Sequence, residues 1–274
     1  MSQPLVITVA PNGARRNKTD HPALPMTSAE IAREAARCRE AGAAMIHLHV
    51  RDASGAHAID SDLYHDAIGA IRREAGREII IQATTEAVGR FTPAEQMAAM
   101  RALQPEAFSV AVRELIPDEA AEGPAALFLA EEARRGTLVQ HILYDAGDVN
   151  RFIDLVEREV IPAPGASVLF VLGRYTQGQQ SAPADLLPLL SRWTLPLPWS
   201  LCAFGRREAA CATAAACLGG HARVGFENNL HRPDGTLAAD NAELVSGLAG
   251  VARALGISIA TADEARTLFA AAGA

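Results

Sequence analysis

Two histidines separated by one residue have the types and spacing in this chain that best suit chemistry. His47 and His49 lie in the apolar run Ile46–Val50, which is typical of the end of a β-strand. Side chains alternate along a strand, so both imidazoles share one face with Arg51 while the apolar residues between them occupy the other. Two imidazoles at this spacing can hold one divalent metal ion. The pattern predicts a metal site, with a pair of hydrogen-bonded barrel histidines as the alternative.

A carboxylate can complete such a site if the chain closes into a barrel. Glu227 ends the last strand-like run, Ala222–Glu227. In a closed barrel the second and eighth strands both flank the first, so Glu227 can reach His47 and His49. Two histidines and one carboxylate with an open position form a catalytic zinc set. Non-haem iron(II) uses the same ligands, so ligand type alone leaves the metal open.

The elements that must position these residues are eight strand-like runs separated by helical ones. The runs are Leu5–Ala10, Ala44–Val50, Glu78–Thr84, Ala107–Val112, Leu138–Leu143, Val168–Leu172, Trp199–Phe204 and Ala222–Glu227. Capping-box patterns, a hydroxyl followed three residues later by Glu, mark helix starts at Thr27, Thr92 and Thr261. Continuous apolar runs between helices indicate parallel strands buried on both faces.

Eight such units in about 250 residues predict an α/β fold, a single (β/α)8 TIM barrel. We expect one domain over residues 1–274. A doubly wound open sheet is the alternative. The turn after the first strand, Pro11–Arg15, lacks the glycine pattern that such sheets usually carry there.

The composition argues against several other classes of function. The 25 basic and 32 acidic residues give a net charge of −7, which argues against general nucleic-acid binding. No run approaches the roughly 18 apolar residues of a membrane helix, and no secretory signal is present, so we expect a cytoplasmic protein without a membrane partner.

Lys18, the only lysine, lies in a polar stretch, which argues against Schiff-base and pyridoxal chemistry. The four cysteines form no C-x-x-C pair and are expected to be reduced thiols.

Several motifs, in the same order along the chain, resemble the β-keto acid cleavage enzyme family. They cover nearly the whole chain and are Ile7–Ala14, Ile46–Arg51, Ile80–Thr85, Phe170–Gly173, Gly205–Arg206 and Gly219–Glu227. The resemblance implies a zinc-dependent barrel that condenses a β-keto acid with acetyl-CoA. Its products would be acetoacetate and the CoA thioester of the shortened acid. It also implies a homo-oligomer, typically a tetramer.

The resemblance also implies roles for individual residues. The zinc ligands would be His47, His49 and Glu227. The hydroxyls of Thr84 and Ser109 would contact the substrate carboxylate, and packing hydroxyls are the alternative. An arginine that orients the catalytic acid would be Arg206, which could otherwise simply begin a helix.

Three departures from the family pattern bear on catalysis and substrate choice. Asn228 is expected to contact substrate but stands where the family has its catalytic aspartate, and an amide cannot accept a proton at neutral pH. Glu86 and Glu114, just past the third and fourth strands, are therefore candidate bases; the substrate or a metal-bound water is the alternative. Arg15 replaces a glutamate suited to a substrate ammonium, which predicts a substrate with a neutral or anionic distal end. The loop Gly173–Gly178 is less glycine-rich than the family's, and its arginine could meet a CoA phosphate.

Two other functions remain open from the sequence. One is a metal-dependent hydrolase or lyase on the same barrel, and the other is a catalytically impaired barrel that only binds a keto acid or metal. Metal hydrolases of this fold usually carry the His-x-His pair on the first strand, and Leu5–Ala10 contains no histidine. Turnover without acetyl-CoA would distinguish the hydrolase.

Overall fold

The computed structural model describes residues 3–271, in which eight parallel strands close into a barrel. Their order around the barrel is β1 (Ile7–Val9), β10 (His221–Val224), β9 (Trp199–Ala203), β8 (Ala166–Leu172), β7 (Leu138–Leu143), β6 (Ala107–Ala111), β5 (Ile80–Thr84) and β2 (Met45–Leu48), with β2 returning to β1. The closed order and parallel pairing confirm the predicted TIM barrel.

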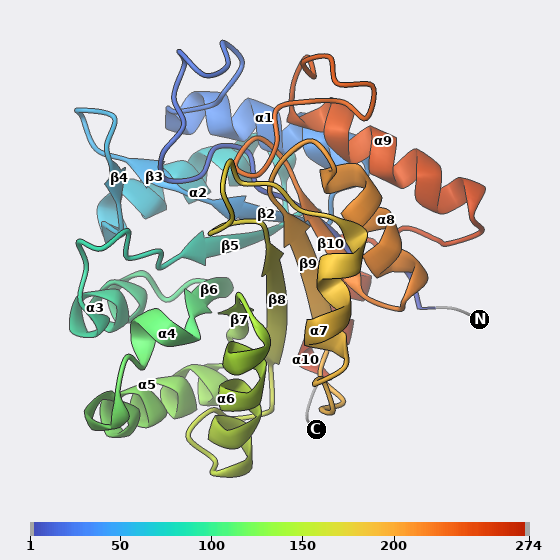
Figure 1. The fold of residues 1–274 in the computed structure, drawn as a ribbon. Helices are drawn as coiled ribbons and strands as arrows, with labels where there is room; N and C mark the ends of the chain where they lie inside the picture. Colours follow the sequence, from blue (N-terminus) through green and yellow to red (C-terminus); the bar gives the residue numbers. More distant parts are fainter. Residues whose placement is uncertain (1–2, 272–274) are drawn as a thin grey trace.

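Helices surround the strands, as Figure 1 shows. Their bounds are α1 (Ser28–Ala41), α2 (Ser61–Ala75), α3 (Pro93–Leu103), α4 (Val112–Leu115), α5 (Glu122–Arg135), α6 (Ala146–Glu157), α7 (Leu187–Leu190), α8 (Glu208–Cys217), α9 (Asn241–Ala254) and α10 (Ala262–Ala270), with 3₁₀ turns η1 (Glu119–Ala121) and η2 (Pro183–Leu186). The capping boxes predicted at Thr27, Thr92 and Thr261 are all formed. Within residues 3–271, no helix combines the length and apolar character needed to cross a membrane.

Several strands differ from their predicted bounds at one or both ends, and two of these differences fall beside the predicted metal ligands. The run Ala44–Val50 is not one strand, because β2 ends at Leu48 and a separate strand β3 (Val50–Arg51) pairs antiparallel with β4 (His57–Ala58). The Asp52 carboxylate accepts hydrogen bonds from the backbone N–H groups that follow it and fixes the tight turn of this hairpin. The eighth run likewise ends as a strand at Val224, so Glu227 lies in a turn beyond β10.

The barrel interior changes from apolar to polar along its axis. At the amino ends of the strands an apolar cluster, closed by Phe269 of α10, fills the interior. Buried polar side chains follow at mid-height: His47, Gln82, Ser109, Gln140, Ser200 and Arg223. Their strands place them next to one another, with His47 opposite Gln82 and Ser109 opposite Gln140 in register. The polar layer and the loops at the carboxyl ends of the strands therefore position the site.

Candidate active site

The two histidines present one ring nitrogen each to the same point. His47 Nδ1 lies 2.8 Å from the carbonyl oxygen Oε1 of Gln82, so this nitrogen carries the proton and Nε2 keeps its lone pair. His57 Nε2 lies 2.9 Å from the backbone oxygen of Glu86, which leaves His57 Nδ1 to accept from His49 Nδ1 at 3.4 Å. In the neutral rings the Nε2 atoms of His47 and His49 both keep their lone pairs, and they lie 3.0 Å apart.

Glu227 reaches this point from the turn after β10. Its carboxylate oxygen Oε2 lies 3.6 Å from His47 Nε2 and 3.4 Å from His49 Nε2. Two glycines allow this approach. A Cβ on Gly13, which has a φ of +65°, would come within 2.5 Å of Glu227 Cγ, and one on Gly225 would come within 2.4 Å of the Ala10 oxygen.

The two Nε2 atoms and Glu227 Oε2 together form a candidate set of metal ligands. They all lie within 4.8 Å of one another, and Glu227 Oε2 is buried with no hydrogen-bond partner among residues 3–271. In their neutral forms the two imidazoles each offer a lone pair from Nε2, and together with the carboxylate oxygen they match the donor set of a divalent metal. The observed residues therefore fit a divalent metal, and the outer nitrogens of both histidines are held by hydrogen bonds in the way metal sites require.

Arg223 is the buried charge that balances Glu227. Its Nη2 lies 3.1 Å from Glu227 Oε1 and 3.3 Å from Cys202 Sγ. Burial alone would raise the pKa of the Glu227 carboxyl, but the charge of Arg223 opposes this effect, and the pKa lies well below its usual range. Burial, with the charge of Arg223, lowers the pKa of His47. The ligands are thus kept in the forms that bind metal, an ionised carboxylate and a neutral imidazole.

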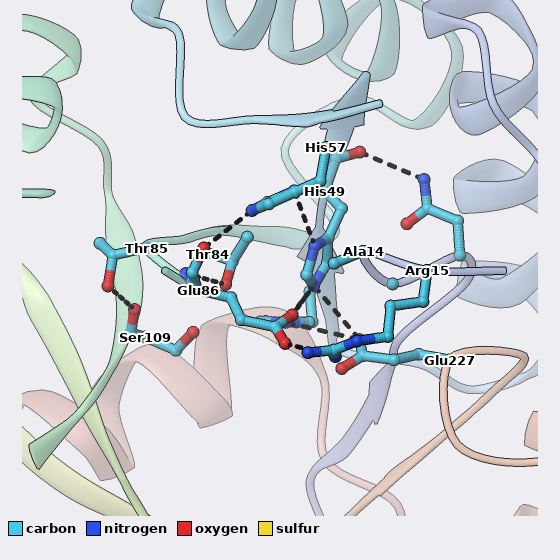
Figure 2. A network of polar contacts seen from close by, with 12 residues as sticks. Ala14, Arg15, His49, His57, Thr84, Thr85, Glu86, Ser109 and Glu227 are labelled. Atoms are coloured by element: carbon cyan, nitrogen blue, oxygen red, sulfur yellow. Dashed lines mark hydrogen bonds and ion pairs between the residues drawn. The ribbon is translucent and has the colours of Figure 1, made fainter. Parts of the chain in front are cut away.

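A second carboxylate, that of Glu86, lies beside the metal ligands. Figure 2 shows it extending from the end of β5 toward His49 and Arg15. Glu86 Oε2 is 4.0 Å from His49 Nε2, while Oε1 is 3.0 Å from Arg15 Nη1 and 3.6 Å from Arg174 Nη2. Burial raises the pKa of Glu86 above its usual value. A small cavity of about 50 Å³ lies among these groups and includes Glu227 in its wall.

The structure separates the two predicted bases. Glu114 accepts a hydrogen bond from the Ala87 N–H at 3.0 Å, and Gln96 Nε2 lies 3.5 Å from the same oxygen. Its carboxylate thus supports the backbone beside Glu86. Burial raises the pKa of Glu114 as well, so the difference between the two acids is one of position.

The two predicted hydroxyls lie side by side on neighbouring strands. Thr84 of β5 is opposite Ser109 of β6, and Thr84 shares the inward face of its strand with Gln82. Thr84 Oγ1 accepts from the Glu86 N–H at 3.1 Å. Ser109 Oγ is buried and has no hydrogen-bond partner among residues 3–271. The pair therefore presents at least one uncommitted hydroxyl to the interior of the barrel.

Comparison with known proteins agrees with this geometry. The model of the family described as beta-keto acid cleavage enzyme matches residues 4–270. The chain is 34% identical to the 3-keto-5-aminohexanoate cleavage enzyme of Fusobacterium nucleatum, over 98% of each chain. The chain belongs to the β-keto acid cleavage enzyme family.

Two further matches place this β-keto acid cleavage enzyme family member among its relatives. It is 30% identical to the 3-oxoadipate:acetyl-CoA acetyltransferase of Cupriavidus necator, over 98% of this chain and 95% of that protein. The apo structure of ObcA superposes with a TM-score of 0.73 over 90% of this chain and 65% of ObcA, at 19% identity. The ObcA match supports the barrel fold alone.

Two residues expected from the family pattern lie in contrasting positions. Arg206 is exposed after β9, and within residues 3–271 it makes no hydrogen bond or ion pair with the metal ligands. Asn228, in contrast, is fully buried beside Glu227, and neither Oδ1 nor Nδ2 of its amide has a hydrogen-bond partner within the described chain. The arginine that contacts the ligand set is Arg223.

Sequence reasoning did not single out Arg223 and His57. An arginine inside a four-residue buried strand was a usable signal for Arg223, because a fully buried arginine requires an anionic partner. His57 lies in a short hairpin of ordinary composition, and no sequence pattern points to it. Its role depends on the turn at Asp52, which carries β4 back past His49.

Proposed function

We propose that this family member condenses a β-keto acid with acetyl-CoA, using a zinc ion bound by His47, His49 and Glu227. The products are acetoacetate and the CoA thioester of the acid shortened by two carbons. The observation that carries the proposal is the convergence of three lone pairs at the barrel mouth with a second carboxylate 4.0 Å from His49. Family membership supplies the reaction class.

The donor set also supports zinc as the metal. Two imidazole nitrogens and one carboxylate oxygen leave a position open for substrate, as catalytic zinc sites do. When bound, the metal would act as a Lewis acid on the 3-keto oxygen of the acid. His57 and Gln82 keep the two imidazoles in the tautomers that this requires.

The hydroxyls and the buried amide are suited to hold the substrate. We assign the substrate carboxylate to Thr84 and Ser109, whose side chains lie together on the inward faces of β5 and β6. The unpartnered amide of Asn228 supports its assignment as a further substrate contact, because a buried amide without hydrogen bonds costs free energy until a ligand satisfies it.

Glu86 is proposed as the general base. It accepts the proton from the carbon between the keto and carboxyl groups, and the carbanion attacks the acetyl-CoA carbonyl and expels CoA thiolate. The thiolate then attacks the keto carbon of the acid, and the bond between that carbon and the former carbanion carbon breaks. The acetoacetate carbanion released in this way takes the proton back from Glu86, and the keto carbon leaves as the shortened CoA thioester.

The position of Glu86 supports this role, since Oε2 faces His49 while Oε1 is held by two guanidinium groups. Asn228 cannot take this proton. Glu114 is bonded to the Ala87 backbone and supports Glu86 from behind.

Two guanidinium groups favour an acid with an anionic distal end. Arg15 and Arg174 both face Glu86, and the Arg15 side chain is 56% exposed at the mouth. An exposed guanidinium binds a carboxylate and repels an ammonium. The relative from Cupriavidus necator is named for 3-oxoadipate, which is a dicarboxylic acid.

The proposal is tested by assaying acetoacetate formation with a panel of anionic, neutral and cationic β-keto acids, each with and without acetyl-CoA. We expect acetoacetate from an anionic acid only when acetyl-CoA is present, with loss of turnover on chelation. Glu86→Gln should lose turnover but keep its metal. Glu114→Gln, whose amide oxygen can still accept from the Ala87 N–H, is the matched control and should keep both turnover and metal. Turnover without acetyl-CoA would instead assign the hydrolase or lyase. No turnover by the metal-loaded protein would favour the impaired barrel.

Two further expectations accompany this proposal. We propose a homotetramer, as the family resemblance implies, which sedimentation measurements test directly. The cytoplasmic location expected from the sequence stays a prediction, which fractionation of the source cells would test.

A further inference from the structure

A solvent-exposed tyrosine stands beside the metal pocket, held in place by its neighbours. Tyr175 follows β8, and its side chain is 66% exposed, unusual for so large an aromatic residue. Its ring packs edge-on against Tyr144, with ring centroids 5.0 Å apart. Tyr144 in turn packs on the apolar cluster of the upper barrel, which includes Cys202 and Phe204. Tyr175 therefore rests on a buried support while its outer surface is open.

Two arginines flank this pair of tyrosines. The guanidinium carbon of Arg113 lies 4.7 Å from the Tyr144 ring centroid and 5.7 Å from that of Tyr175. That of Arg174 lies 5.7 Å from the Tyr175 centroid and 5.3 Å from that of Phe204. Asp145 and Asp148 fix Arg113 through its Nη2. Guanidinium groups at these distances attract the ring faces and restrict their movement.

The loop that carries Tyr175 is ordered by its own hydrogen bonds. Thr176 Oγ1 lies 3.0 Å from the Gly173 oxygen and 2.7 Å from the Gln180 oxygen, and the Gln180 N–H donates to it at 2.9 Å. Ser181 Oγ donates to the Phe204 oxygen at 2.7 Å. These bonds close the loop and tie it to the end of β9, so binding at Tyr175 needs little further ordering.

The same loop connects this surface to the metal pocket. Arg174, next to Tyr175 in the chain, lies in the wall of the pocket and is 3.6 Å from Glu86. A ligand that extends from the pocket across Arg174 meets the Tyr175 ring next. An exposed, rigid aromatic ring with guanidinium groups close by suits a planar heteroaromatic base that is joined to negatively charged phosphates.

We propose that Tyr175, supported by Tyr144 and flanked by Arg113 and Arg174, stacks the adenine of the CoA thioester. This inference rests on the proposed function, which requires a CoA thioester at the pocket. Stacking of the nucleotide on Tyr175 leaves the pantetheine arm to enter past Arg174. The site thus recognises the part of the thioester that takes no part in the chemistry.

Calorimetric titration with adenosine 3′,5′-bisphosphate tests the site without any turnover. We expect Tyr175→Ala to raise the dissociation constant by about tenfold, and Tyr175→Phe, which keeps the ring, to leave it nearly unchanged. Leu127→Ala, a truncation at a side chain 74% exposed on α5, is the matched control and should have no effect. Equal affinity in Tyr175→Ala and the unchanged protein would overturn the proposal, as would the absence of binding.

Kinetics with two thioesters separate this inference from the proposed function. In Tyr175→Ala the KM for acetyl-CoA should rise by about tenfold with kcat unchanged, whereas the KM for S-acetylpantetheine, which lacks the nucleotide, should stay the same. If no acetoacetate forms with any acid, the proposed function fails while the calorimetry still decides the site. A variant with altered association state and unaltered nucleotide affinity would assign Tyr175 to an interface with a second copy of the chain and overturn the proposal.

Discussion

The floor and the rim of the site are built in contrasting ways. The floor consists of His47, Gln82 and Arg223, which are all at most 3% exposed and hydrogen-bonded to other buried groups. From Gln82 the bonds continue across the barrel through Gln140 to Ser200. The rim consists of Arg15 and Tyr175 on loops, both more than half exposed.

This difference suggests that the floor supports the chemical step and that the rim determines the choice of substrate. A buried network of hydrogen bonds has one arrangement, and changing any member leaves a buried polar group unpaired. Exposed loop residues make few buried contacts and can be exchanged at little cost to the fold. We therefore expect floor substitutions to alter metal binding and rim substitutions to alter which acid or thioester is used.

Removal of a metal ligand should have the largest effect. In His49→Ala the ligand set loses one of its three donors, and we expect loss of bound metal with at least a roughly 100-fold drop in kcat. Metal content measured on the purified variant checks this. His65→Ala, at an exposed histidine on α2, is the control and should retain the full complement. Full metal content in His49→Ala would show that the metal lies elsewhere.

Gln82→Leu tests the floor one step away from the metal. Without the Gln82 carbonyl, His47 Nδ1 loses its acceptor and the imidazole is free to adopt the wrong tautomer. The metal dissociation constant should rise about 10- to 100-fold, which competition with a chelator measures. Gln180→Leu, at an exposed glutamine, is the control. An unchanged metal affinity would mean that the floor does not act through the orientation of His47.

Arg15→Glu tests the rim and should leave metal binding unchanged. Because a charged hydrogen bond to the distal carboxylate would be lost and replaced by repulsion, kcat/KM for anionic acids should fall about tenfold or more. The ratio of kcat/KM for anionic and cationic acids gives the result. Arg134→Glu, an exposed exchange on α5, controls for net charge. An unaltered ratio would remove Arg15 from substrate recognition.

The candidate metal ligands could be predicted from sequence because their positions depend on local periodicity and on the order of the strands. Strand alternation placed His47 and His49 on one face, and closure of the barrel brought Glu227 to them, as the 3.4 and 3.6 Å distances bear out. The helix starts followed from capping boxes, which act over three residues. Each of these inferences needs only neighbouring residues or a known strand order.

The remaining features depend on contacts between residues far apart in the chain. The pairing of Glu86 with both Arg15 and Arg174 joins three loops, and no periodicity specifies where loop side chains end. The break after Leu48 likewise depends on a turn that returns β4 to β3. The residue type alone also does not show whether a side chain is buried. Glu208 is an example, because the sequence gives no reason to treat it as other than a surface acid.

Glu208 provides the last and smallest test of the buried floor. It lies at the start of α8, is 2% exposed, and accepts from the Gly225 N–H at 3.0 Å and from Asn229 Nδ2 at 3.3 Å, so it fixes the turn that carries Glu227. Burial raises its pKa to about 8, although these hydrogen bonds and the charges of Arg16 and Arg223 oppose the shift. The folded state therefore holds this proton more tightly than the unfolded chain.

The sign of the pH dependence follows from the raised pKa. The contribution of Glu208 to stability is complete below the unfolded value near 4.5 and is lost as pH rises through about 8. Relative to Glu208→Gln, which does not titrate, the free energy of unfolding of the unchanged protein should fall by at least about 1 kcal/mol between pH 5 and pH 9. Urea denaturation at several pH values measures this difference, with Glu157→Gln, at an exposed acid, as the control. Parallel curves for the Glu208→Gln and unchanged proteins would mean that Glu208 stays ionised throughout, and the turn that carries Glu227 would then be held by a permanent buried charge.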